Sequence, residues 1–168
     1  MNIVRPQPPH PQSVYYALLS SLAKTIFLQA ETEVTAEKRS AGPLARVAAN
    51  LLGELEEFAD IFWAKLCQRV GGWAVPIVVP ITDTDGTAFD EAQRAKVLGY
   101  LSPDEPLAEY SARITGIMRV YFHILCAPVS KPLGPMLSLP RLWTYISRLM
   151  SDKQLLINPV APELLYGM

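Results

Sequence analysis

Two cations spaced four residues apart are the strongest sign of chemistry in this sequence. Lys65 and Arg69 lie in an apolar stretch, residues 58–76, which reads FADIFWAKLCQRVGGWAVP. Residues at this spacing share one helix face, where like charges repel slightly and a bound anion would offset the repulsion. A solvated helix edge, with Glu57 or Asp60 nearby, accounts for the spacing on its own. One wall of a phosphate-binding pocket is the sharper hypothesis.

A phosphate pocket needs further cations from other parts of the fold. Lys24, Arg94 and Lys96 are the candidates. They lie far from Lys65 in the sequence, so periodicity alone does not show whether the fold brings them together. Ammonium and guanidinium groups bind phosphate oxygens strongly, so their convergence would favour the pocket over the solvated edge.

The other reactive side chains form no catalytic or metal-binding pattern. The histidines are His10 and His123, and together with Cys67 and Cys126 they give no zinc spacing. The sequence contains no motif for nucleotide binding, for a serine nucleophile or for a zinc protease. We expect the cysteines to be buried, reduced thiols. We therefore predict that the chain is not an enzyme and binds no metal.

The composition bounds the class of protein. The chain has 168 residues, half of them hydrophobic and only 18% charged, which suits one domain with a sizeable core. The net charge is −1, so no global basic field supports strong direct binding of nucleic acid. The longest apolar run is broken by Pro76 and Pro80, so we expect no membrane span. Two cysteines without a signal peptide favour an intracellular protein.

Helical periodicity dominates the chain, and the predicted helices must position the cations. Apolar residues recur at steps of three or four between turns rich in proline or glycine. We predict six or seven helices, over roughly 13–38, 43–55, 58–70, 90–100, 107–125, 140–150 and the last residues. Residues 71–87 predict an apolar loop across the helix ends. Short turns between amphipathic helices favour antiparallel packing, in a HEAT-like solenoid or a globular bundle.

Local signals add detail to this arrangement. Ser13 is a candidate N-cap of the first helix, and Val47 is expected on the buried face of the second. Gly116, inside the strongest helical pattern, indicates close contact with a neighbouring helix. We expect Trp143 in the core and Trp73, in a glycine-rich loop, to be the more exposed tryptophan.

The two ends of the chain differ from its middle. Residues 1–12 are rich in proline, which disfavours helix, so we expect an extended or disordered entry. Residues 13–168 are expected to form an all-α domain. The sequence stops just as the apolar residues of PELLYGM begin to pack, so we expect that domain to be incomplete at its C-terminus.

Segments along most of the chain resemble, in order, the C-terminal domain of the GLE family, messenger-RNA export mediators of the nuclear pore. They are LAKTIFLQAETEV (22–34), PLARVAANLL (43–52), the basic-pair helix up to Val-Pro (58–76), LGY (98–100), EYSARITGIMRVYFHIL (109–125) and LPRLW (139–143). The resemblance runs from about Val14 to the end of the chain. It implies an all-α, HEAT/MIF4G-like domain of antiparallel helical repeats.

The resemblance also implies a function. Members of this family bind a DEAD-box RNA helicase and stimulate its ATPase cycle at the cytoplasmic face of the nuclear pore complex. In fungal members inositol hexakisphosphate bridges the two proteins. An FG-repeat nucleoporin and translation initiation and termination factors are further implied partners, in the nucleus and cytoplasm. The residues alone leave open a helical scaffold that binds proteins without a polyphosphate ligand.

Four residues of this chain match the family's inositol-phosphate site. Lys65 and Arg69 fall where the family's binding helix has its basic pair. Lys96 falls near a further basic position, and Lys24 near a lysine of the first helix. Fungal members place lysines around the glycine–aromatic step, whereas this chain has Leu101 there, which implies a weaker wall on that side.

Overall fold

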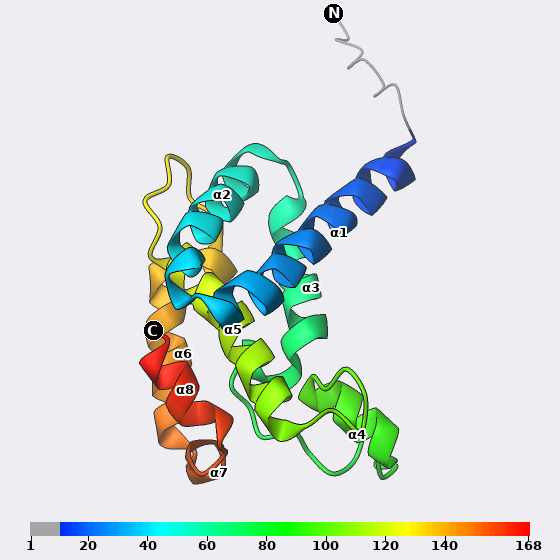
Figure 1. Ribbon diagram of the computed structural model, residues 1–168. Coiled ribbons are helices and arrows are strands. Elements are labelled where there is room, and N and C mark those ends of the chain that lie inside the picture. The colour runs from blue at the N-terminus through cyan, green and yellow to red at the C-terminus, as the bar shows by residue number, and fades with distance from the viewer. Residues whose placement is uncertain (1–10) are drawn as a thin grey trace, which may run out of the picture.

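The computed structural model describes residues 11–168, which form helices joined by turns and loops (Figure 1). The helices are α1 (Gln12–Gln29), α2 (Ala41–Glu54), α3 (Phe58–Val70), α4 (Glu91–Leu98), α5 (Leu107–Leu125), α6 (Leu139–Ser151), α7 (Lys153–Leu156) and α8 (Val160–Tyr166). Shorter turns are the π-helical η1 (Ala30–Val34) and the 3-10 turns η2 (Lys38–Ser40), η3 (Gly71–Ala74) and η4 (Pro135–Leu137). The described residues contain no strand, only an isolated bridge between Thr82 and Ala88. The all-α prediction is confirmed.

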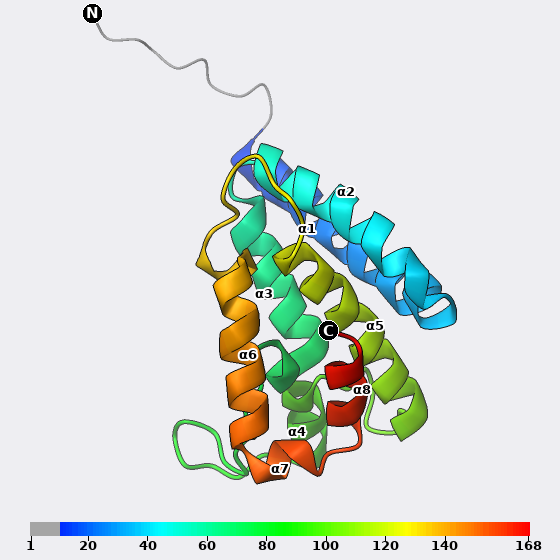
Figure 2. The same ribbon diagram turned by 90° about the vertical axis from the view of Figure 1, so that its left-hand side faces the viewer.

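Helix α5 is the centre of the domain. Twelve of its 19 residues are buried, as expected for a helix that others enclose. It contacts α2, η1, α3, α6 and α8, and successive long helices reverse direction around it (Figure 2). A Cβ on Gly116 would lie 2.8 Å from Thr35 Oγ1 and 2.9 Å from the Ala30 carbonyl oxygen. The predicted close contact at Gly116 is therefore confirmed.

The first helix begins one residue before the predicted start. Gln12 is its first residue, so Ser13 lies inside the first turn and the prediction of a Ser13 cap is wrong. The reason is that Pro11, with its fixed φ, already occupies the entry position. Residues 1–10 of the predicted proline-rich entry lie outside the described residues.

A π-helical turn, η1, interrupts the helix that the sequence predicted to run unbroken to about residue 38. Its residues, AETEV, carry no local signal for a wider turn. Ala30 and Val34 are buried, and η1 packs against α5 opposite Gly116. The wider turn therefore accompanies tertiary packing, and single π-helical turns of this kind are frequent at functional sites.

Small side chains line the buried face of α2. The buried residues are Ala41, Ala45, Ala48, Ala49 and Leu52. Val47, which was predicted to be buried, is exposed. The alanines allow α2 to approach α5 closely, so the centre of its buried face is formed mainly by small side chains.

The two tryptophans occupy environments opposite to those predicted. Trp73, in η3, is 5% exposed, and its Nε1 donates to the Tyr110 hydroxyl at 2.7 Å. Trp143, on α6, is 70% exposed. The apolar residues of α6 form one wide face, of which Tyr145 and Leu149 are buried and Trp143 is exposed. Periodicity identifies such a face but does not decide which part of it is covered.

The loop between η3 and α4 ends in a well-defined helix start. The predicted turn forms, with the Gly86 N–H donating to the Asp83 carbonyl at 3.0 Å. Asp90 and Gln93 then cap α4 reciprocally, each side chain accepting from the other's backbone N–H at 2.6 and 3.1 Å. This fixes the start of the helix that carries Lys96.

Two further features concern the predicted absences. Within residues 11–168, no helix combines the length and hydrophobicity needed to cross a membrane. Over the same residues, no cluster of three His, Cys, Asp or Glu side chains is placed to hold a metal.

Cys126 is exposed and Cys67 is partly buried, so the expected burial of both thiols is wrong. Burial raises the pKa of the Cys67 thiol, which disfavours a reactive thiolate.

Candidate functional site

Four cations from three helices line one open cavity of about 520 Å³. Helix α1 supplies Lys24, α3 supplies Lys65 and Arg69, and α4 supplies Lys96. Among the described residues that line this anion pocket there is no aspartate or glutamate. The structure thus brings together all four residues that the family resemblance implied. Their arrangement suits an anion with several charges.

Lys65 lines a shallow cavity with Glu57 and Asp60, the acids that the sequence suggested, but does not pair with them. Its Nζ donates to Gln68 Oε1 at 3.0 Å, and among the described residues it forms no ion pair with Glu57 or Asp60. Its charge is therefore not neutralised locally. Arg94 lines a separate cleft beside η3 and does not join the anion pocket.

Two glycines allow α3 and α4 to end against each other. Gly71 and Gly99 have φ values of 56° and 89°, a region that other residues rarely adopt. A Cβ on Gly71 would lie 2.6 Å from the Gly99 nitrogen, and one on Gly99 would lie 2.6 Å from the Val70 carbonyl carbon. The two backbones are in direct contact, which sets the separation between the cations of α3 and that of α4.

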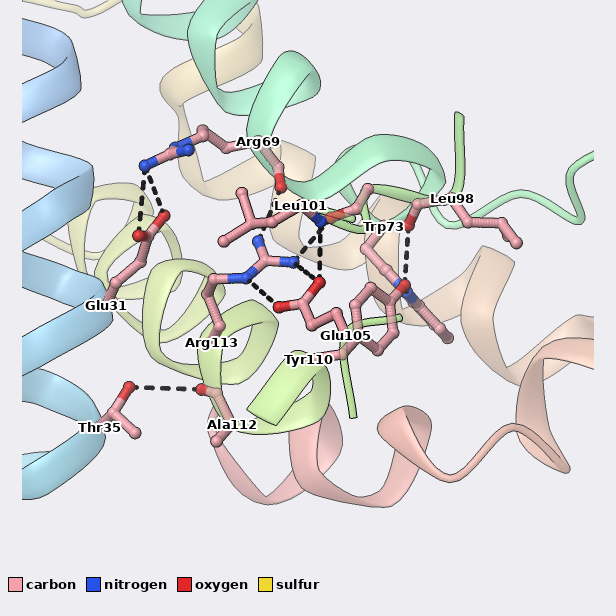
Figure 3. Close-up of polar contacts among 11 residues, drawn as sticks. Glu31, Thr35, Arg69, Trp73, Leu98, Leu101, Glu105, Tyr110, Ala112 and Arg113 are labelled. Carbon is pink, nitrogen blue, oxygen red and sulfur yellow. Dashed lines mark hydrogen bonds and ion pairs between the residues drawn. The ribbon is translucent and has the colours of Figure 1, made fainter. Parts of the chain in front are cut away.

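Arg113 holds the same two helix ends from the side of α5 (Figure 3). Its Nη1 donates to the Arg69 carbonyl at 3.1 Å, and its Nη2 donates to the Gly99 carbonyl at 2.8 Å. Nε and Nη2 also donate to both oxygens of Glu105, at 2.8 and 2.9 Å. Burial opposes ionisation of Glu105, but the hydrogen bonds from Arg113 and from the Leu101 N–H outweigh it and lower the carboxyl pKa.

An aromatic contact supports the rim formed by the loop after α4. The ring of Tyr100, which lines the pocket, stacks on Tyr110 with 3.8 Å between the ring centroids. The Tyr110 hydroxyl donates to the Leu98 carbonyl and accepts from Trp73, both at 2.7 Å. Burial raises the pKa of Tyr110 to about 12, so it remains a neutral donor. The rim is therefore anchored to buried groups.

Arg69 reaches away from α3 to an acid on the first helical segment. Its Nη2 lies 3.1 and 3.2 Å from the two carboxylate oxygens of Glu31, in η1 (Figure 3). The side chains of Arg69 and Glu31 are 22% and 11% exposed. Burial raises the pKa of Glu31, although Arg69 and Arg113 act in the opposite direction. One of the four cations thus already has a counter-ion.

Comparison with known families identifies the relatives of this chain. A family model described as GLE1-like protein matches residues 2–168. The chain belongs to the GLE1-like protein family. The GLE1-like chain is 26% identical over 152 residues to the mRNA export factor Gle1 of Drosophila melanogaster, which covers 87% of this chain and 22% of that protein. It therefore spans about a fifth of the length of this relative.

Solved structures share the fold of the GLE1-like chain. One is a complex of a variant S. cerevisiae Dbp5 C-terminal domain bound to Gle1 and IP6, with a TM-score of 0.73 and 21% identity. The match covers 89% of this chain and 50% of that one. A second such complex, in which Gle1 carries one substitution, matches with the same values. The expected fold of the family is confirmed.

Sequence reasoning missed the residues that support the pocket. Arg113 lies in the most buried helix, and a charged residue within a buried pattern is a signal that it has a partner. The partner, Glu105, stands just before that helix and could have been proposed with it. Glu31 gave no comparable signal, because an acid in the sequence ETE is typical of a solvated helix face.

Proposed function

We propose that this GLE1-like chain is a non-enzymatic mRNA export factor that binds a DEAD-box RNA helicase and stimulates its ATPase. Inositol hexakisphosphate is the bridging ligand, and Lys24, Lys65, Arg69 and Lys96 bind it. The convergence of these four cations on one cavity is the observation that carries the proposal. The structural relatives support it, because they are complexes of Gle1 and Dbp5 with IP6.

The physical role of the ligand follows from charge. Four cations on one surface repel a basic surface of a partner, whereas a polyphosphate between the two surfaces turns that repulsion into attraction. Lysine supplies mobile point charges and arginine supplies a planar set of donors. Leu101, on the rim, contributes no charge, so we expect weaker binding than in a site with a lysine there.

The effect on the helicase is conformational. The GLE1-like chain binds one open arrangement of the two helicase lobes more tightly than the others, so it shifts their population. Release of nucleotide or RNA becomes faster, and ATP turnover rises. We place this activity at the cytoplasmic face of the nuclear pore complex, in contact with an FG-repeat nucleoporin, and we include translation initiation and termination factors among the partners.

The test is the ATPase rate of a Dbp5-type helicase with this chain, with and without inositol hexakisphosphate. Replacing Lys65 and Arg69 by aspartate should abolish the ligand-dependent stimulation while the helical circular dichroism survives. Arg46→Asp with Arg148→Asp is the matched control, because it makes the same change of charge at exposed positions outside the pocket. Unchanged stimulation in the pocket variant would refute the site.

A helical scaffold that binds proteins without a polyphosphate remains the alternative function. The exposed apolar residues on the outer side of the domain, such as Trp143 and Ile157, favour protein contacts of this kind. Calorimetry distinguishes the two functions. Heat of binding and a thermal shift with inositol hexakisphosphate support the polyphosphate site, and the absence of both supports the scaffold.

A further inference from the structure

The anion pocket contains one cation that is not free. Arg69 is the only one of its four cations that is ion-paired among the described residues, and its partner Glu31 lies just outside the lining of the cavity. The guanidinium uses Nη2 for this contact, and its Nε is buried without a hydrogen-bond partner. Its Nη1 is not among the buried unpaired atoms and forms no hydrogen bond with the described residues, so Arg69 is held towards η1 with Nη1 available to a ligand.

The backbone holds Glu31 in this position. It lies in the π-helical turn η1, which is fixed by the burial of Ala30 and Val34 and by contact with α5. The Glu31 side chain is only 11% exposed, so it lies among neighbouring groups and not in solvent. A carboxylate is therefore kept at the edge of a pocket suited to anions.

The charges around Glu31 are unbalanced. Arg69 from α3 and Arg113 from α5 attract it, and Glu105 from the loop before α5 repels it. Arg113 is already bonded to Glu105 at 2.8 Å, so Arg69 is the partner that Glu31 contacts directly. Burial outweighs these attractions and raises the pKa of Glu31, which means that protonation of this carboxyl is facilitated.

We infer that Glu31 is an internal counter-ion that competes with the polyphosphate for Arg69 and so restrains occupancy of the pocket at neutral pH. This inference rests on the proposed function, and it adds a regulatory residue to that site. The ligand must share or displace the Arg69–Glu31 contact, and its phosphates also meet repulsion from the carboxylate. Protonation of Glu31 removes both obstacles.

Acidification alone is an ambiguous test, because phosphate monoesters lose charge below a second pKa of about 6. Glu31→Gln supplies the reference, since it keeps an oxygen that accepts from Arg69 but removes the charge. The effect of Glu31 is then the ratio of wild-type to variant dissociation constants at each pH. The matched control is Glu33→Gln, which removes the same charge from the same turn at an exposed side chain that contacts Gln29.

The experiment is calorimetry with inositol hexakisphosphate from about pH 7.5 down to the ordinary glutamate pKa of 4.5, above which burial raises the pKa of Glu31. We expect Glu31→Gln to bind on the order of tenfold more tightly at the upper end. The wild-type to variant ratio should fall as the pH falls. Glu33→Gln should change binding by less than about twofold. Circular dichroism shows whether each variant is folded.

The other outcomes of this experiment distinguish failure of the inference from failure of the proposed function. If the wild type binds and Glu31→Gln binds equally or more weakly, the inference is wrong while the proposed function stands. A gain that is the same at every pH would also overturn the inference, because it would not follow the titration of Glu31. If neither protein binds at any pH, the polyphosphate site itself is refuted.

Discussion

The Arg113–Glu105 and Arg69–Glu31 pairs contain the same chemical groups in two different settings. Both side chains of the first pair are 7% exposed, and Arg113 also donates to two backbone carbonyls. The second pair is more exposed, and Arg69 bonds Glu31 through Nη2 alone. All three guanidinium nitrogens of the first arginine are bonded within the protein, whereas Nη1 of the second is left for another molecule.

This difference separates an arginine that supports the pocket from one that we propose to bind the ligand. Arg113 joins the ends of α3 and α4, and those helices carry three of the four pocket cations. Its own positive charge is cancelled by Glu105, so it adds structure to the site without adding charge. Arg69 adds charge to the pocket, but Glu31 diminishes it. The number of contacts that each arginine makes within the protein therefore distinguishes the two proposed roles.

The largest effect is expected from Arg113→Ala. It leaves the buried Glu105 without its cationic partner and removes donors from the Arg69 and Gly99 carbonyls, so we expect a loss of about 3–5 kcal/mol in the free energy of unfolding. Urea denaturation measures it. Arg113→Lys, which keeps the charge but not the fork of donors, should lose less. A loss below about 1 kcal/mol would place Arg113 in the same class as a surface pair.

A smaller loss is expected where the two helix ends touch. Gly99→Ala places a side chain at φ 89° and within 2.6 Å of the Val70 backbone, so we expect a loss of about 2–4 kcal/mol. Gly86→Ala is the control, because it has φ 86° but nothing within 4 Å of the added Cβ. Chemical denaturation of both separates backbone strain from close approach. Equal losses would mean that the contact contributes nothing.

Much of the fold could be predicted because helical periodicity and turn residues are local signals. The expected helix over residues 58–70 has the observed bounds, with Phe58, Phe62 and Leu66 in the core. The part of the wide apolar face of α6 that meets the core could not be predicted, because all the apolar residues of that face satisfy the same period. The π-helical turn η1 could not be predicted from the sequence either, since it accompanies packing against α5.

The site was predictable only in part. Lys65 and Arg69 could be paired from spacing, but their convergence with Lys24 and Lys96 depends on how three helices cross, which periodicity does not contain. Lys24 and Lys96 were candidates with Arg94 because of their charge, and the family resemblance matched these two to the site. Their role in binding a ligand stays a prediction. Glu31 was missed for the same reason, because its contact with Arg69 links two helical segments far apart in sequence.

The pH dependence of stability should distinguish the two acids. The pKa of Glu105 is lowered from 4.5, so its stabilising contribution is present above that value and is lost as the pH falls through the lowered pKa. The pKa of Glu31 is raised from 4.5, so its contribution is present below that value and is lost as the pH rises through the raised pKa. Urea unfolding of wild type, Glu105→Gln and Glu31→Gln across the acid range measures both. If the two substitutions changed the pH dependence of the free energy of unfolding in the same direction, the opposite roles of Glu105 and Glu31 would be contradicted.

The smallest effect is expected from Glu31→Gln on stability at neutral pH. The amide oxygen can still accept from Arg69, and the substitution removes a carboxylate that burial disfavours, so the free energy of unfolding should change by less than about 0.5 kcal/mol. Thermal and urea denaturation measure it beside the calorimetric gain in ligand binding. A loss of about 2 kcal/mol or more would make Glu31 a structural anchor like Glu105. The contrast between a supporting pair and a competing pair would then no longer hold.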